Sequence, residues 1–206
     1  FSLRLLTVSI DKIIFDFDGT VADTFQLNVG LIKEMRPDTS KKEIELFRNN
    51  GVAVLQKELN LSLKEVLKLL GLLAKKQTQI INKAKIFPGI KNIFDELRKK
   101  NIKFIILSSN STENIEKWLG HQKIKVDKII THNNIFGKDK LLKKMGKQFV
   151  YVGDEVRDVE ACKKAGVKII GVTWGFNTKK ALERAKADYL VDNRMELRKL
   201  LLTLIQ

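Results

Sequence analysis

Short apolar runs alternate with longer helical patterns along most of this 206-residue chain. Runs with the length and composition of strands are Lys12–Phe17, Lys103–Leu107, Gln148–Val152, Lys168–Val172 and Tyr189–Val191. Segments with apolar residues at helical spacing are Ile90–Lys100, Thr112–Leu119, Asp139–Met145, Arg157–Ala165, Thr178–Ala185 and Met195–Leu204. This alternation predicts an α/β fold, with a Rossmann-like parallel sheet covered by helices on both faces.

One segment, residues 23–86, breaks the alternation. It contains only helical periodicity, over Phe25–Met35, Lys41–Leu59 and Ser62–Lys85, and the turn residues Phe87-Pro88-Gly89 close it. A helical segment placed directly after the first strand predicts a small cap, with residues 1–22 and 87–206 forming the α/β core.

Polar and acidic residues follow three of the predicted strands. In an open parallel sheet the carboxyl ends of the strands share one edge, where ligands bind. The sequence therefore predicts a functional site at this edge, built from three sets: Asp16, Asp18, Gly19 and Thr20; Ser108, Ser109 and Asn110; Asp154 and Asp158.

The acids of this predicted site indicate a metal ion. Asp16 and Asp18 are two residues apart at a strand end, so their side chains can face the same side, and Asp154 and Asp158 add further negative charge. Carboxylates that close repel each other unless a cation lies between them, and ligation by oxygen alone favours Mg²⁺ over Zn²⁺. Gly19 permits a tight turn, and Thr20 offers a donor to a phosphate group.

Four motifs resemble those of the haloacid dehalogenase superfamily, in the same order. They are Asp16-Phe17-Asp18-Gly19-Thr20, Ile105–Ser111, Phe136-Gly137-Lys138 and Gly153–Asp158. Within that superfamily the chain looks most like the phosphoglycolate-phosphatase-like hydrolases, which carry a small helical cap after the first motif. The run Gly171–Phe176 also resembles that group, and we interpret it as a packed loop near the site.

The resemblance implies a phosphatase mechanism with defined catalytic residues. Asp16 would attack phosphorus and form a phosphoaspartyl intermediate, and a carboxylate needs no deprotonation at neutral pH to do so. Asp18 would protonate the leaving oxygen and then deprotonate the water that hydrolyses the intermediate. Lys138 would neutralise negative charge on Asp16 and on the phosphoryl group.

The resemblance also implies the binding groups. Ser108 would hold the phosphoryl oxygens, with Ser109 and Asn110 as adjacent candidates. Magnesium would be bound by the carboxylates of Asp16 and Asp154 and by the main-chain carbonyl of Asp18. We expect Asp158 to support the metal through its water ligands.

The net charge of +15 raises the alternative of a basic nucleic-acid-binding module. Lysines are spread along the whole chain without an arginine-dense patch, so we interpret them as solvated helix faces that attract anionic substrates, with no nucleic-acid partner. The chain has a single cysteine and its apolar runs are too short to cross a bilayer, so we expect a cytoplasmic monomer or homodimer without a membrane partner.

Two further enzymatic interpretations use the same superfamily motifs. A dehalogenase needs no acid at the second position, so Asp18 argues against it. A phosphomutase uses the same aspartyl-phosphate chemistry and stays open. The segment Arg48-Asn49-Asn50, at the break between predicted cap helices, is compatible either with a site-facing role or with a solvated helix end.

Overall fold

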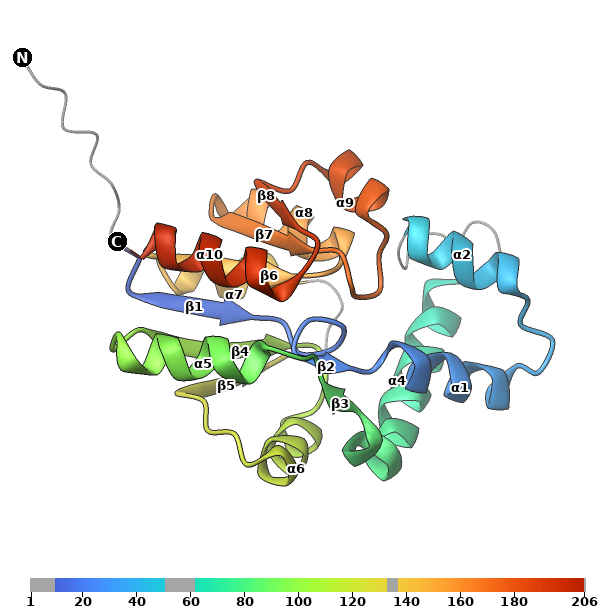
Figure 1. Ribbon diagram of the computed structural model, residues 1–206. Coiled ribbons are helices and arrows are strands. Elements are labelled where there is room, and N and C mark those ends of the chain that lie inside the picture. The colour runs from blue at the N-terminus through green and yellow to red at the C-terminus, as the bar shows by residue number, and fades with distance from the viewer. Residues whose placement is uncertain (1–9, 51–61, 133–136, 206) are drawn as a thin grey trace, which may run out of the picture.

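A parallel β-sheet forms the centre of the molecule in the computed structural model, which describes residues 10–50, 62–132 and 137–205. Within these residues the sheet has six strands in the order β5-β4-β1-β6-β7-β8, all paired in parallel (Figure 1). The strands are β1 (Lys12–Phe15), β4 (Lys103–Ser108), β5 (Lys128–Thr131), β6 (Phe149–Gly153), β7 (Lys168–Val172) and β8 (Tyr189–Val191). The predicted α/β fold with a parallel sheet is confirmed.

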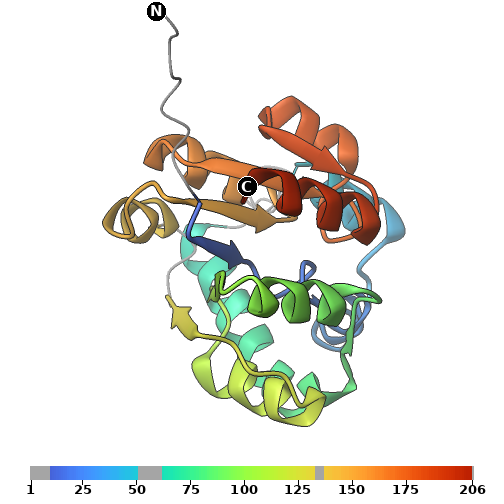
Figure 2. The same ribbon diagram turned by 60° about the vertical axis from the view of Figure 1, so that its left-hand side comes forward.

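Helices cover both faces of this sheet. One face packs against α5 (Ile90–Lys99), α6 (Thr112–Gln122) and α10 (Arg194–Leu204). The opposite face packs against α7 (Lys138–Lys144), α8 (Val156–Ala165) and α9 (Lys179–Ala185). Figure 2 shows α5 and α7 on opposite sides of β1.

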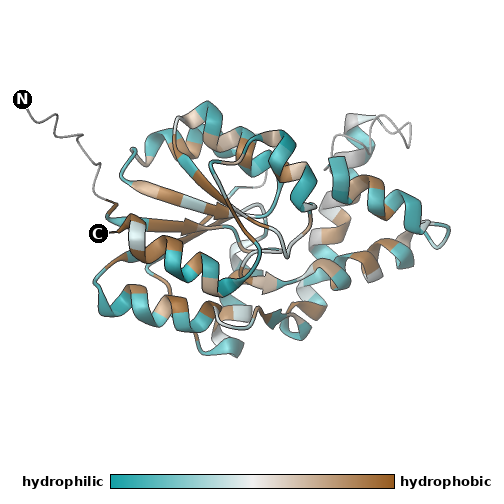
Figure 3. Ribbon diagram, turned by 45° about the horizontal axis from the view of Figure 1, so that its top comes forward, coloured by the Kyte–Doolittle hydropathy of each residue, from teal (hydrophilic) through white to brown (hydrophobic). Residues whose placement is uncertain are grey.

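Side chains of successive strand residues enter these two layers in turn. Ile13 and Phe15 of β1 belong to the first layer, whereas Ile14 between them belongs to the second. This follows from the two-residue period of a strand, and it explains why the three buried residues of β1, covered on both faces, are all apolar (Figure 3).

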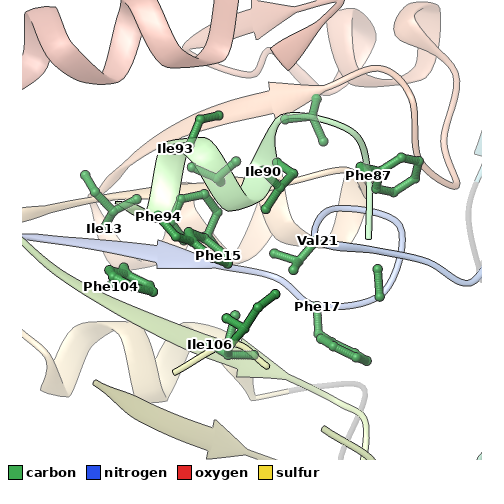
Figure 4. Packing of buried hydrophobic residues seen from close by; sticks show 14 of the residues in the cluster. Ile13, Phe15, Phe17, Val21, Phe87, Ile90, Ile93, Phe94, Phe104 and Ile106 are labelled. Carbon is green, nitrogen blue, oxygen red and sulfur yellow. The ribbon is translucent and has the colours of Figure 1, made fainter. Parts of the chain in front are cut away.

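Aromatic rings fill the first layer beside the central strand. Phe94 of α5 meets Phe15 edge to face, with ring centroids 5.1 Å apart, and stacks on Phe104 of β4 at 4.6 Å (Figure 4). Such pairs add roughly 0.5–1.5 kcal/mol each to the free energy of burying the rings. They hold β1 rigidly, and with it the residues that follow β1.

A helical insertion lies beyond the carboxyl end of β1 (Figure 1). It contains α1 (Phe25–Met35), α2 (Lys41–Asn50), α4 (Leu63–Ile80) and the 3₁₀ turn η1 (Ile81–Lys83). Ser62 caps α4, accepting a hydrogen bond from the Glu65 amide while the Glu65 carboxylate accepts from Ser62. None of the helices in the described residues combines the length and hydrophobicity needed to span a bilayer.

The structure adds strands that sequence patterns did not predict. The edge strand β5 is one of them. The others are β2 (Ala22–Asp23) and β3 (Lys85–Ile86), which pair antiparallel at the two ends of the insertion, so that segment is not purely helical. The predicted first strand also ends early, at Phe15 rather than Phe17. The expected helix over Lys41–Leu59 is observed to Asn50, and residues 51–59 lie outside the described part of the chain.

Candidate active site

Asp16 directly follows β1, and its backbone amide still donates to the Val152 carbonyl of the neighbouring strand β6. Its side chain is 3% exposed, with one oxygen accepting from the Phe17 amide at 2.8 Å. The other oxygen lies 3.1 Å from the Lys138 ammonium. The end of the central strand therefore places a carboxylate against a buried cation.

Lys138 is the first residue of α7, after Gly137 with φ of 130°. Its ammonium donates to the Asp158 carboxylate at 2.5 Å and to the Tyr151 hydroxyl at 2.8 Å, in addition to Asp16. All three donors of the ammonium thus have partners, which a buried charge requires. The two carboxylates raise the pKa of Lys138 in spite of its burial, so the side chain stays charged.

Asp154 follows β6 and is fully buried. Its two oxygens accept hydrogen bonds from the Thr20 hydroxyl and from the Phe176 amide, each at 2.7 Å. Gly19 and Gly175 pack so closely on this carboxylate that a Cβ at either position would come within 3.0 Å of it. Asp154 is therefore fixed between the loop after β1 and the loop after β7.

Three carboxylates form one buried group. Oxygens of Asp16, Asp154 and Asp158 all lie within 4.8 Å of one another. Asp158 accepts from Lys138 and from the Glu155 amide. Asp16 accepts from Lys138 on one oxygen and from a neutral amide on the other. Both donors to Asp154 are neutral. With one lysine among three acids, the donor set carries an excess of negative charge and fits a hard divalent cation.

Burial has the largest effect on the pKa values of this group, and the neighbouring charges modify it. Burial raises the pKa of Asp16 to about 8, with Lys138 opposing the shift and Asp158 adding to it. Burial also raises the pKa of Asp154 well above its usual range, and the nearby acids act in the same direction. Burial alone would raise the pKa of Asp158, but Lys138 and Arg157 outweigh it and hold that pKa below its usual range.

Asp18 lies outside this carboxylate group. One of its oxygens accepts from the Asn110 side-chain amide at 2.9 Å, and the other accepts from Gln77 of α4 at 3.1 Å. Asn110 also donates to Gln77 and accepts from the Ser111 amide and from the Asn114 side chain. All polar atoms of the Asn110 side chain thus have protein partners, Asp18 among them, so this side chain is not directed at a phosphoryl group.

The residues after β4 lie at the same edge of the sheet. Ser108 is 1% exposed, and its hydroxyl accepts from the Asn110 amide at 3.0 Å. The Ser109 hydroxyl accepts from the Arg157 guanidinium at 3.4 Å, and Arg157 is held by buried Glu155 at 2.5 Å. A second cation, partly exposed, therefore lies beside the serines.

The predicted site residues occupy the positions expected from the strand ends, with differences in detail. Thr20 is buried and its hydroxyl binds Asp154, so it positions that acid. The loop containing Phe176 contacts Asp154 directly, a closer involvement than a packed loop near the site. Arg48 donates to the Phe176 carbonyl, and the Asn49 side chain accepts from Thr178, so both contact the core, whereas Asn50 bonds only within its own helix.

Several contributors carry no local sequence signal. Gln77 lies 59 residues from Asp18 in an ordinary helical pattern, and Tyr151 has the position of a core residue in a buried strand. Glu155 and Arg157 belong to the fourth motif, and their charges near Asp154 could have indicated a role.

An acid–lysine cluster buried at the carboxyl edge of a Rossmann-like sheet defines an enzyme of the α/β class. The family model described as haloacid dehalogenase-like hydrolase matches residues 13–172. The chain belongs to this family.

Relatives with curated names agree with this assignment. The phosphoglycolate phosphatase of Synechococcus elongatus is 30% identical over 202 residues, covering 91% of this chain and 95% of the relative. The phosphoglycolate phosphatase of Pseudomonas putida is 23% identical, covering 88% of this chain and 76% of the relative. The chain is a hydrolase, and these relatives place it among the enzymes that act on phosphoric monoesters.

Solved structures share the fold. A predicted phosphatase from Clostridium acetobutylicum superposes with a TM-score of 0.79, covering 95% of this chain and 99% of that chain at 20% identity. A hydrolase from Pseudomonas syringae gives a TM-score of 0.74 over the same shares of the two chains, at 21% identity.

Proposed function

We propose that this enzyme is a magnesium-dependent phosphatase that forms a phosphoaspartyl intermediate on Asp16 and hydrolyses a small phosphorylated metabolite similar to phosphoglycolate. The observation that carries the proposal is the contact between the Asp16 carboxylate and the buried Lys138 ammonium at the end of the central strand. A carboxylate nucleophile needs a neighbouring cation, because the phosphoryl group that it attacks is itself negatively charged.

The acids of the site support magnesium. Asp16 must be ionised to act as a nucleophile, yet burial and the neighbouring acids raise its pKa to about 8. A divalent cation held by Asp16 and Asp154, with the Asp18 main-chain carbonyl that the family resemblance implies, would favour the ionised form. Magnesium bound there supplies positive charge to the phosphoryl oxygens. Asp158, which lies in the same carboxylate group and binds Lys138, would support the metal through its water ligands.

The chain's own residues carry the two displacement steps. An Asp16 oxygen bonds to phosphorus while the bond to the leaving oxygen breaks, and Asp18 gives its proton to that oxygen. In the second step a water oxygen bonds to phosphorus, its proton passes to Asp18, and the electron pair of the breaking bond returns to Asp16. Lys138 stabilises the charge on Asp16 throughout, and Ser108 lies at the neighbouring strand end to contact the phosphoryl group.

The substrate class follows from the charges around the site and from the named relatives. Arg157 places a guanidinium beside Ser109, close enough to affect the pKa of both Asp16 and Asp18. This second cation favours a small substrate with an anionic group besides the phosphate, as phosphoglycolate has. The insertion of residues 23–86 would act as a cap, because Gln77 reaches Asp18 from it.

We further propose a cytoplasmic enzyme that acts as a monomer or homodimer, without a nucleic-acid or membrane partner. The single cysteine, which is buried, and the even spread of lysines support this proposal.

A hydrolysis assay with magnesium and with excess chelator tests the central claim. We expect turnover of a generic aryl phosphate and of phosphoglycolate only with the metal, and equal activity after chelation contradicts the proposal. Asp154→Asn should weaken magnesium binding because it removes a charged ligand.

Two aspartate variants test the intermediate. Asp16→Asn should abolish every step. Asp18→Asn keeps the nucleophile, so an activated aryl phosphate should leave a phosphoryl group on Asp16 that mass spectrometry detects. If Asp18→Asn never traps this adduct and Asp16→Asn continues to turn over, the nucleophile is a different residue.

A further inference from the structure

Gln77 is a buried polar side chain contributed by the insertion. It lies in the last turn of α4 and is 4% exposed, whereas Lys76 and Gln79 beside it are exposed. Burying an amide is unfavourable unless its hydrogen-bonding groups find partners. Those of Gln77 do: its nitrogen donates to Asp18 at 3.1 Å and to Asn28 of α1 at 3.0 Å, and its oxygen accepts from Asn110 at 2.8 Å.

These contacts fix the orientation of the Gln77 amide. Its nitrogen faces two oxygen acceptors, on Asp18 and Asn28, and its oxygen faces a nitrogen donor on Asn110. The reversed orientation would direct an oxygen at two oxygens and a nitrogen at a nitrogen, so every one of the three bonds would be lost. Asp18, as a carboxylate, and Asn110, whose oxygen accepts from the Ser111 main-chain amide, therefore set this orientation, and Asn28 adds a second acceptor.

Asp18 is held between the α/β core and the insertion. One carboxylate oxygen accepts from Asn110, which follows β4, and the other accepts from Gln77. Both bonds are made to the carboxylate as acceptor, so they favour its ionised form and oppose the effect of burial on its pKa. A carboxylate has about four acceptor sites, so it can still receive a proton beside these donors.

We propose that Gln77 is a positioning residue for Asp18, oriented through Asn110, and that it holds the Asp18 carboxylate in place for proton transfer. This rests on the proposed function, because it assumes that Asp18 is the acid and base of the reaction. Gln77 itself neither bonds to phosphorus nor transfers a proton. It transmits the position of the insertion to the proton-transferring group.

The test compares the same substitution at two positions of one helix. Gln77→Met removes the amide and keeps an unbranched side chain of similar length, and Gln79→Met makes the same change at an exposed position. Gln77→Asn, which keeps the amide one methylene shorter, provides a second variant if Gln77→Met does not fold. Circular dichroism and thermal unfolding establish that each variant is folded.

Two substrates separate a positioning role from a merely structural one. A nitrophenyl phosphate releases a leaving group that departs without a proton, whereas an alkyl phosphate needs one. With magnesium present, we expect Gln77→Met to lower kcat/KM for the alkyl ester at least ~10-fold more than for the nitrophenyl ester, part of the ~100-fold or larger effect of general acid catalysis. Gln79→Met should leave both values within about twofold of wild type.

The outcomes distinguish this inference from the function on which it rests. Equal losses with the two esters, or a rise in KM at unchanged kcat, would assign Gln77 to folding or to substrate binding and overturn the positioning role alone. A wild-type enzyme that hydrolyses neither ester with magnesium would overturn the proposed function and the positioning role together.

Discussion

Replacing Gly175 with alanine tests how tightly the Asp154 carboxylate is held. The new Cβ would lie closer than 3.0 Å to three atoms of Asp154, whereas ordinary van der Waals contact begins at 3.4 Å. Moving Asp154 would break hydrogen bonds, because it is fully buried and both of its oxygens are hydrogen-bonded. Gly175 does not have a positive φ, so the effect of the alanine comes from this overlap and not from backbone strain.

The expected size follows from overpacking. Inserting a methyl group into a filled site costs about 1–3 kcal/mol of unfolding free energy. For a chain of this length each 1 kcal/mol lowers Tm by roughly 2–4 °C. A displaced Asp154 should also weaken magnesium binding by about 10–100-fold, the range seen when the support of a metal ligand is disturbed.

Gly120→Ala provides a control of opposite sign. Gly120 lies in α6, and a Cβ there would meet nothing within 4 Å. Alanine should therefore stabilise the protein by about 0.5–1 kcal/mol through helix propensity. Urea unfolding and magnesium titration calorimetry measure both variants. If Gly175→Ala is as stable as wild type and binds magnesium equally well, Asp154 is not held as described.

The remaining predictions concern the buried charges. Lys138→Met should lower kcat at least ~100-fold and destabilise the fold by about 3–5 kcal/mol, since it leaves two buried carboxylates without their cation. The same change at the exposed Lys140 should do neither. A small effect at Lys138 with a large one at Lys140 would mean that the motif lysine is misassigned. In chelator, stability should fall as the pH rises from about 4 to about 8. The pKa of Asp16 is about 8 in the folded state against 3.8 for an ordinary aspartate, so the folded state binds the extra proton in that window. Urea unfolding at several pH values should show a shallower fall for Asp16→Asn and for wild type with magnesium, and an unchanged slope would refute the shifted pKa.

Sequence patterns predicted the strands that are buried on both faces of the sheet. The strands β1, β4 and β6 are apolar runs because both of their faces are covered, and their ends identified Asp16, Ser108 and Asp154. The edge strand β5 was not predicted because it is only partly buried, so its apolar run is limited to Ile129-Ile130. The two-residue strands β2 and β3 are too short for any periodicity to reveal.

The missing part of the candidate site has a different cause. Gln77 bonds Asp18 across 59 residues and Arg48 bonds Phe176 across 128, and such pairings depend on tertiary packing. A glutamine in a helix has no local feature that distinguishes a solvent-facing amide from one that holds a carboxylate. The motifs predicted the residues after the strands, whereas the contacts made by the insertion required the folded structure. The boundary between cap and core stays a prediction.

The short ladder of β2 and β3 bears on how this architecture diversifies. Ala22 pairs with Ile86 and Asp23 with Lys85, so the two ends of the insertion lie side by side. The register of β1 is set by its partners β4 and β6, which lie outside the insertion. We therefore expect changes in the length of the insertion to leave that register unaltered. We therefore expect that an exchange of insertions between relatives can keep Asp16 in place, provided that the new insertion also replaces the contacts of Gln77 with Asp18 and of Arg48 and Asn49 with the loop after β7. The paired residues 22–23 and 85–86 are the positions at which we expect one insertion to be exchanged for another with least effect on β1.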